Sequence, residues 1–93
     1  MPTFNGQHID VVVDVRTKLE FWLGHLDGAV NMPVGDVAEL LPERSDVARD
    51  ANILVYCASG ARSAAAAAEL RELGYTNVTD GGGIGAARAG YTP

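Results

Sequence analysis

The sequence predicts an α/β domain in which strands and helices alternate along the chain and the strands form a parallel sheet. The apolar runs at residues 11–15 and 53–56 are typical of strands that are covered on both faces. Helical signals follow each run, and this alternation favours a parallel sheet with helices on both faces. With 93 residues the chain has room for one compact domain, so we expect a single domain over residues 1–93.

Local signals place the remaining elements. Thr17 and Glu20 have the spacing of a capping box, which marks the start of a helix that Gly24 ends. Asp36 is expected to cap a second helix and Pro42 to stop it. In order, we expect strands at residues 11–15, 29–32, 53–56 and around Val78, and helices at residues 18–23, 37–41, 63–73 and 84–89.

The only cysteine, Cys57, stands between the strand at residues 53–56 and an alanine-rich helix. At such a junction it faces free N–H groups and the positive end of the helix dipole, which favour the nucleophilic thiolate. Gly60 permits a backbone conformation that other residues rarely adopt, and its small neighbours let the loop form an anion-binding nest of amides. The predicted site is Cys57 as the nucleophile, with a binding loop of Ala58, Ser59, Gly60, Ala61, Arg62 and Ser63. The alternative is that Cys57 is a buried, unreactive cysteine.

Charged residues follow the first strand at the same edge of the predicted sheet, where the active sites of parallel sheets gather. Asp14 is expected to support the site by accepting hydrogen bonds from loop amides, because a buried carboxylate needs partners. Arg16 either pairs with Glu20 or reaches the rim of the site, and the sequence leaves both open. We expect Arg62 to order the loop or to bind an anion, since a cation at a helix start otherwise opposes the dipole.

Three other features have simpler interpretations. His25 is expected to support the fold and not to act as a base, and Trp22 to lie in the core or at an interface. The glycines at residues 81–83 lack the lysine and the spacing of a nucleotide-binding loop, so we expect a tight turn there.

Composition argues against several classes of function. The formal net charge of -5 disfavours binding to nucleic acid or to an anionic membrane. No apolar run is long enough to span a bilayer. A single cysteine excludes an internal disulfide and a paired-cysteine metal site, and the two histidines are far apart, so no metal is expected. The N-terminus has no signal-peptide pattern, so a cytoplasmic location is expected, although a mature exported chain would look the same.

Four motifs occur in an order shared with one known family. They are Asp14-Val15-Arg16 with Glu20-Phe21 after it, the segment Gly24-His25-Leu26-Asp27-Gly28-Ala29-Val30-Asn31-Met32-Pro33, the loop Cys57–Ser63, and Leu73-Gly74-Tyr75-Thr76-Asn77-Val78 followed by the glycines at 81–83. From about Val11 to Tyr91 the chain resembles single-domain rhodaneses (thiosulfate sulfurtransferases), most of all the small phage-shock-protein-E type. The resemblance implies a five-stranded parallel sheet flanked by helices on both faces, with Cys57 carrying sulfur as a persulfide. The chain departs from the family in its uncharged loop and at Ala87 or Arg88, where a tryptophan is frequent.

The resemblance implies a sulfur transfer in two steps. The Cys57 thiolate attacks the outer sulfur of thiosulfate and releases sulfite, and a thiol or cyanide then takes the sulfur from the persulfide, as in ping-pong covalent catalysis. No metal or organic cofactor is required, because sulfur itself is carried.

Three other functions stay open at this point. One is a relay that passes sulfur to another protein, and another is a non-catalytic interaction module. The third is a phosphatase or arsenate reductase, but those enzymes place five residues between the cysteine and the arginine, whereas four stand between Cys57 and Arg62. The smaller loop fits a single sulfur atom better than a tetrahedral oxyanion. We expect the chain to be a monomer.

Overall fold

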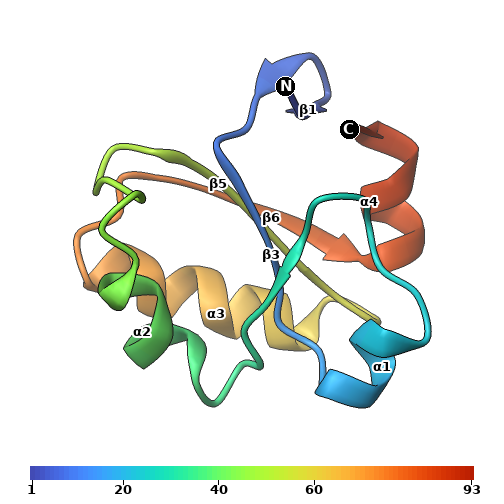
Figure 1. Cartoon of the computed structure of the whole chain (residues 1–93), viewed down its shortest axis with the longest axis horizontal. Helices are drawn as coiled ribbons and strands as arrows, with labels where there is room; N and C mark the ends of the chain where they lie inside the picture. The colour runs from blue at the N-terminus through green and yellow to red at the C-terminus, as the bar shows by residue number, and fades with distance from the viewer.

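A four-stranded parallel sheet runs through the computed structural model, which describes all of residues 1–93 (Figure 1). Its strands are β3 (Val11–Asp14), β4 (Val30–Asn31), β5 (Asn52–Cys57) and β6 (Asn77–Gly83), in the order β4-β3-β5-β6. The predicted α/β class and parallel sheet are confirmed, but the sheet has four strands and not the expected five. β5 lies between β3 and β6, so its last residue, Cys57, stands at the carboxyl end of an inner strand.

The segment before β3 forms a second, small sheet, which is why it does not extend the parallel one. β1 (Thr3–Phe4) pairs antiparallel with β2 (Gln7–His8) and with β7 (Tyr91–Thr92). Asn5 and Gly6 make the turn between β1 and β2 with φ angles of 50° and 82°, as an Asn-Gly hairpin requires. The antiparallel pairing uses the hydrogen-bonding edges of β1 and holds the two ends of the chain together (Figure 1).

Helices cover both faces of the parallel sheet, as predicted. They are α1 (Lys18–Trp22), α2 (Val37–Leu40), α3 (Ala61–Glu72) and α4 (Ile84–Gly90), with a 3-10 helix, η1 (Leu41–Glu43), after α2. Figure 1 shows α2 and α3 on one side of the sheet and α4 on the other. Side chains alternate along β5, so that Ile53 and Val55 face the α3 side while Leu54 and Tyr56 face Ala87 of α4.

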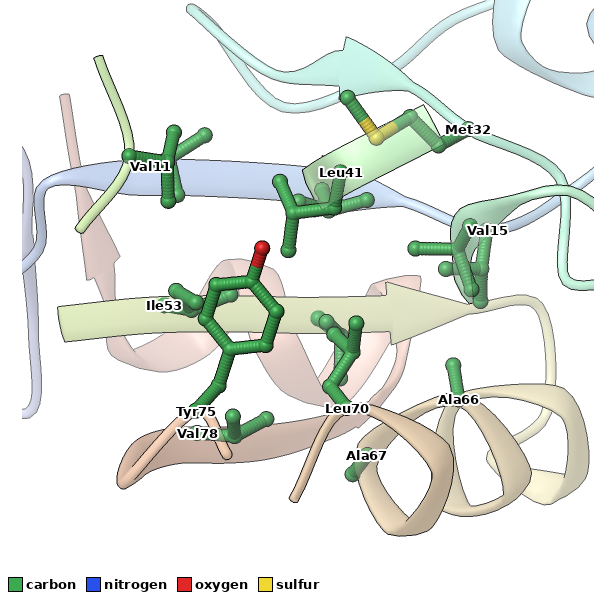
Figure 2. Packing of buried hydrophobic residues seen from close by; sticks show 14 of the residues in the cluster. Val11, Val15, Met32, Leu41, Ile53, Ala66, Ala67, Leu70, Tyr75 and Val78 are labelled. Carbon is green, nitrogen blue, oxygen red and sulfur yellow. The ribbon is translucent and has the colours of Figure 1, made fainter. Parts of the chain in front are cut away.

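The larger core lies between the sheet and α3 (Figure 2). Ala66, Ala67 and Leu70 are fully buried on the face of α3 that meets the strands. The two alanines allow α3 to approach the sheet closely, and Leu70 and Tyr75 fill the space near its far end (Figure 2). The alanine-rich composition of α3 therefore determines how near its N-terminus comes to the end of β5.

Helix signals in the sequence predicted both α1 and α2, but one capping bond is absent. The capping box is confirmed, because Thr17 and Glu20 exchange both expected hydrogen bonds. Asp36 precedes α2, but its side chain makes no capping hydrogen bond. The α-helix ends at Leu40, before Pro42, as expected, and the chain continues in η1, where Pro42 lies in the first turn and its missing N–H leaves no bond unmade.

The α1 helix exposes most of its apolar residues. The side chains of Leu19, Trp22 and Leu23 are 65%, 79% and 72% exposed. A helix of five residues contacts the body of the protein along one narrow face, and that face carries Glu20 and Phe21, which are partly buried. Of the two predicted places for Trp22, the core is therefore wrong, and an interface stays a prediction.

Candidate active site

Cys57 ends β5 at the carboxyl edge of the sheet, and α3 begins at Ala61 (Figure 1). The chain reverses direction at Gly60, whose φ of 106° is a left-handed conformation that favours glycine. The reversal brings the free N–H groups of the α3 N-terminus close to the last residue of β5. This is the edge at which parallel α/β folds form their active sites.

Two polar groups of the loop contact the sulfur atom. The N–H of Gly60 donates a hydrogen bond to Sγ of Cys57 at 2.9 Å, and Oγ of Ser63 lies 3.5 Å from Sγ. Ser63 is fully buried, and its hydroxyl donates to the carbonyl oxygen of Gly60 at 3.1 Å. A hydroxyl hydrogen rotates to suit its surroundings, so the same group can donate to the sulfur once the thiol is ionised.

These neighbours lower the pKa of the Cys57 thiol below its ordinary value. Burial is the largest single influence and acts in the other direction, because it raises the pKa. The hydroxyl of Ser63 and the main-chain N–H groups of Ser63, Gly60 and Ser59 together outweigh burial. Since the thiolate is the nucleophilic form, the loop favours the reactive state of the cysteine.

Cys57 is nevertheless fully covered and belongs to the core cluster beside α3. Burial alone would fit an inert cysteine, but an inert cysteine needs neither an amide nor a hydroxyl donor at its sulfur. The exposed residues of the loop, Ala58, Ser59 and Ala61, are small and uncharged. The surface over the sulfur is therefore neutral, and a reagent reaches Sγ only when part of the loop shifts.

Arg62 points its charge toward α1. Its Nη1 and Nη2 atoms donate to the two carboxylate oxygens of Glu20 at 2.7 and 3.0 Å. Arg62 and, to a lesser extent, the N–H of Thr17 lower the pKa of Glu20 to about 2. The geometry thus fits the predicted role of Arg62 in ordering the loop. Sequence analysis did not include Glu20 in the site, because nothing local connects two residues that are 42 positions apart.

Asp14 and Arg16 form a buried ion pair beside the loop. Nη2 of Arg16 lies 2.8 Å from Oδ2 of Asp14, and the N–H of Arg16 donates to Oδ1 at 2.9 Å. Nη2 also donates to the carbonyl oxygen of Gly24 at 2.6 Å. Arg16 therefore does not pair with Glu20, because Asp14 is nearer and shares its turn. The pair braces the connection from β3 to α1, and neither side chain hydrogen-bonds the Cys57 loop.

The glycines at residues 81–83 are the end of β6 and not the predicted tight turn. A Cβ atom on Gly83 would lie 2.6 Å from the carbonyl oxygen of Ala58, closer than real Cβ atoms come to other atoms. The carbonyl oxygen of Gly82 lies 3.5 Å from Oγ of Ser63. Glycine at position 83 therefore lets the Cys57 loop sit directly on the end of β6, a function that the sequence alone did not reveal.

The cavity of the protein lies apart from the cysteine. It has a volume of about 200 Å³ and is lined by His25, Leu26, Asp27, Arg88, Tyr91 and Pro93. The ring of His25 stacks on Phe21 at 3.7 Å between centroids, and its Nδ1 lies 2.8 Å from the Phe21 carbonyl oxygen. His25 thus contacts the framework and not the sulfur. No group of three potential metal-ligating side chains gathers anywhere, and every helix is too short or too polar to cross a membrane.

The fold and the site define a parallel α/β domain with a candidate nucleophilic cysteine between its central strand and a helix N-terminus. The rhodanese-like domain family matches residues 3–83, which is most of the chain, and the chain belongs to that family. The predicted resemblance to single-domain rhodaneses is therefore confirmed.

Individual relatives agree with this assignment. The thiosulfate sulfurtransferase PspE of Escherichia coli (strain K12) is 33% identical over 88 residues, which are 90% of this chain and 77% of that protein. A solved structure described as rhodanese with anions from E. coli has a TM-score of 0.79 and 29% identity, and the match covers 88% of this chain and 95% of that chain.

A relative with a different name is also similar. The tRNA uridine(34) hydroxylase of Pectobacterium carotovorum subsp. carotovorum (strain PC1) is 40% identical over 83 residues. The match covers 84% of this chain but 23% of that protein. Domains similar to this one therefore also occur within longer proteins that are named for other activities.

Proposed function

We propose that this chain is a sulfurtransferase that carries sulfane sulfur on Cys57. The observation that supports this most directly is the pair of polar groups at Sγ, where the N–H of Gly60 donates at 2.9 Å and the hydroxyl of Ser63, which can turn to donate to a thiolate, lies at 3.5 Å. These donors stabilise the thiolate before the reaction and are placed to stabilise the negative charge of a persulfide after it. The name of the PspE relative, thiosulfate sulfurtransferase, supports the same reaction class.

The proposed reaction has two balanced steps. The Cys57 thiolate attacks the outer sulfur of thiosulfate, a new S–S bond forms, and sulfite leaves with the electron pair of the broken S–S bond. A thiolate or cyanide then attacks the outer sulfur of the persulfide, which yields an acceptor persulfide or thiocyanate and restores the Cys57 thiolate. No proton has to be removed from a neutral nucleophile in either step, so the mechanism needs no histidine base.

The other residues of the site have supporting roles in this proposal. The main chain of the loop from Ala58 to Ser63 holds the sulfur, and Arg62 fixes the loop through Glu20. The Asp14–Arg16 pair supports the turn that leads into α1. A relay that passes the sulfur to a cysteine of another protein uses the same Cys57 chemistry, and the neutral surface over the covered sulfur favours it as the second candidate.

Mass spectrometry of the intact protein tests the proposal. After incubation with thiosulfate, the protein is expected to gain about 32 Da, the mass of one sulfur atom, and to lose it with cyanide while thiocyanate appears. A Cys57→Ser variant should keep its circular dichroism spectrum and gain no mass. An unmodified wild-type protein, or a gain that persists in Cys57→Ser, would contradict the proposal.

A further inference from the structure

The loop that holds Cys57 is tied to α1 through one carboxylate. Glu20 receives two hydrogen bonds from the guanidinium of Arg62, at 2.7 and 3.0 Å, a bidentate geometry that fixes the orientation of the arginine. The N–H and the hydroxyl of Thr17 also donate to Glu20, both at 3.0 Å. The carboxylate therefore cannot turn away from Arg62 without also breaking the capping box of α1.

The second cation at this edge of the sheet is neutralised in the same way. Arg16 pairs with Asp14 at 2.8 Å, and only 9% of its side chain is exposed. The exposed loop residues carry no charge, so no unpaired cation stands on the Cys57 loop or at the end of β3. A small dianion such as thiosulfate binds best where an arginine or lysine has a free donor, and this site offers only uncharged donors, the main-chain N–H groups and the hydroxyl of Ser63.

Arg62 lies in the first turn of α3, next to Ser63, whose hydroxyl oxygen is 3.5 Å from the sulfur. The hydrogen bonds with Glu20 raise the pKa of Arg62 most strongly, and the negative charge of the Cys57 thiolate raises it further. The guanidinium and the sulfur therefore interact electrostatically. An incoming anion therefore experiences the combined charge of Arg62 and Glu20, which is close to zero.

We propose that Glu20 is a specificity-determining residue, which holds Arg62 in an ion pair and so withholds its positive charge from anions that approach Cys57. This role adds a substrate preference to the proposed function, and the preference among sulfur donors rests on that function. The wild-type site discriminates against dianionic donors and favours reactants of lower charge, such as a persulfide or thiol on a larger molecule. Removal of the Glu20 charge frees Arg62 for the approaching anion.

Two alkylating reagents measure this effect directly. Iodoacetamide is neutral and iodoacetate is an anion, and both react with the same thiolate, so the ratio of their rate constants does not depend on the Cys57 pKa or on how often the loop opens. In Glu20→Gln, which preserves the size of the side chain, the iodoacetate-to-iodoacetamide ratio should rise about threefold at low ionic strength. The rise should shrink as salt is added.

Two matched variants separate this role from a structural one. Glu39→Gln on α2, across the molecule from α1 (Figure 1), makes the same change in net charge and should leave the ratio unchanged. The double variant Glu20→Gln/Arg62→Gln should return the ratio to the wild-type value, because the freed positive charge of Arg62 is then absent. An equal ratio in Glu20→Gln and wild type, or an equal rise in Glu39→Gln, would overturn the proposal.

Turnover with thiosulfate and cyanide distinguishes this inference from the proposed function. The KM for thiosulfate should fall several-fold in Glu20→Gln, with a smaller change in kcat. If the wild-type protein transfers no sulfur while the alkylation ratio responds as expected, the sulfurtransferase proposal fails and the charge-masking role of Glu20 stands. If the wild-type protein transfers sulfur but the ratio and the KM do not respond, the role of Glu20 fails and the function stands.

Discussion

The N–H of Gly60 points at the sulfur of Cys57 across 2.9 Å, and the left-handed φ of 106° at Gly60 is what turns it there. Few other residues adopt this angle without strain. The polar environment of the thiol is thus built from backbone geometry and one buried hydroxyl, while both nearby arginines are engaged with carboxylates. This arrangement leads to four predictions, two about the cysteine, one about the strand beside it and one about the buried Asp14–Arg16 pair.

Ser63→Ala should raise the pKa of Cys57, because it removes the hydroxyl near Sγ and leaves the thiol buried. In the wild type the pKa is lowered, so the iodoacetamide rate should reach half its maximum below the usual pH of about 8.5. That midpoint should move upward in Ser63→Ala. The control is Ser59→Ala, which removes an exposed hydroxyl and keeps the main-chain N–H; its midpoint should match the wild type.

The same shift has a consequence for stability. Because the folded protein has the lower thiol pKa, ionisation of Cys57 stabilises the fold. This contribution is fully present above the pKa of the unfolded thiol and is lost as the pH falls through the folded pKa. Urea unfolding at pH 7 and pH 9.5 should therefore show a free energy of unfolding that is higher for the wild type than for Cys57→Ser by a larger margin at the higher pH. A constant difference would mean that folding does not change the thiol pKa.

Gly83→Ala should damage the site from the neighbouring strand. The new methyl group would lie 2.6 Å from the carbonyl oxygen of Ala58, so the Cys57 loop has to move away from β6. We expect a loss of about 1–3 kcal/mol in the free energy of unfolding, measured with urea, and a large fall in sulfur transfer. Gly85→Ala in α4 is the control, because its methyl group meets no atom within 4 Å and alanine favours a helix. Equal behaviour of the two variants would refute the steric argument.

Asp14→Asn should destabilise the protein strongly, because it leaves the buried guanidinium of Arg16 without its countercharge. Breaking one partner of a buried pair costs about 3–5 kcal/mol, which urea unfolding detects. Asp46→Asn provides the comparison, since the Arg44–Asp46 pair also has a 2.7 Å contact but its carboxylate is 64% exposed. The exposed pair should contribute less than about 1 kcal/mol. A loss below that value in Asp14→Asn would show that the buried pair is not structural.

The sequence predicted the order of the central elements because their signals are local. The apolar run of β5, the capping box of α1 and the alanine-rich α3 each depend on residues within one or two helical turns. The two-residue strands β1, β2 and β7 were missed, because strands of this length have no detectable periodicity. The sequence also left open whether Trp22 lies in the core or at an interface, since the side on which a short helix packs depends on its neighbours and not on its own composition.

For this protein, the sequence by itself determined the α/β class, the family and the identity of the candidate nucleophile. A cysteine that follows a buried strand and precedes a helix can be recognised from consecutive residues. Only the tertiary structure decided that Arg62 pairs with Glu20, that Gly83 makes room for Ala58, and that Asp14 holds Arg16. The first two of these join segments far apart in the chain, and in the third the sequence left the partner of Arg16 open. These contacts depend on the folded structure, because a buried charge or carbonyl group needs a partner among the groups that the fold brings close to it.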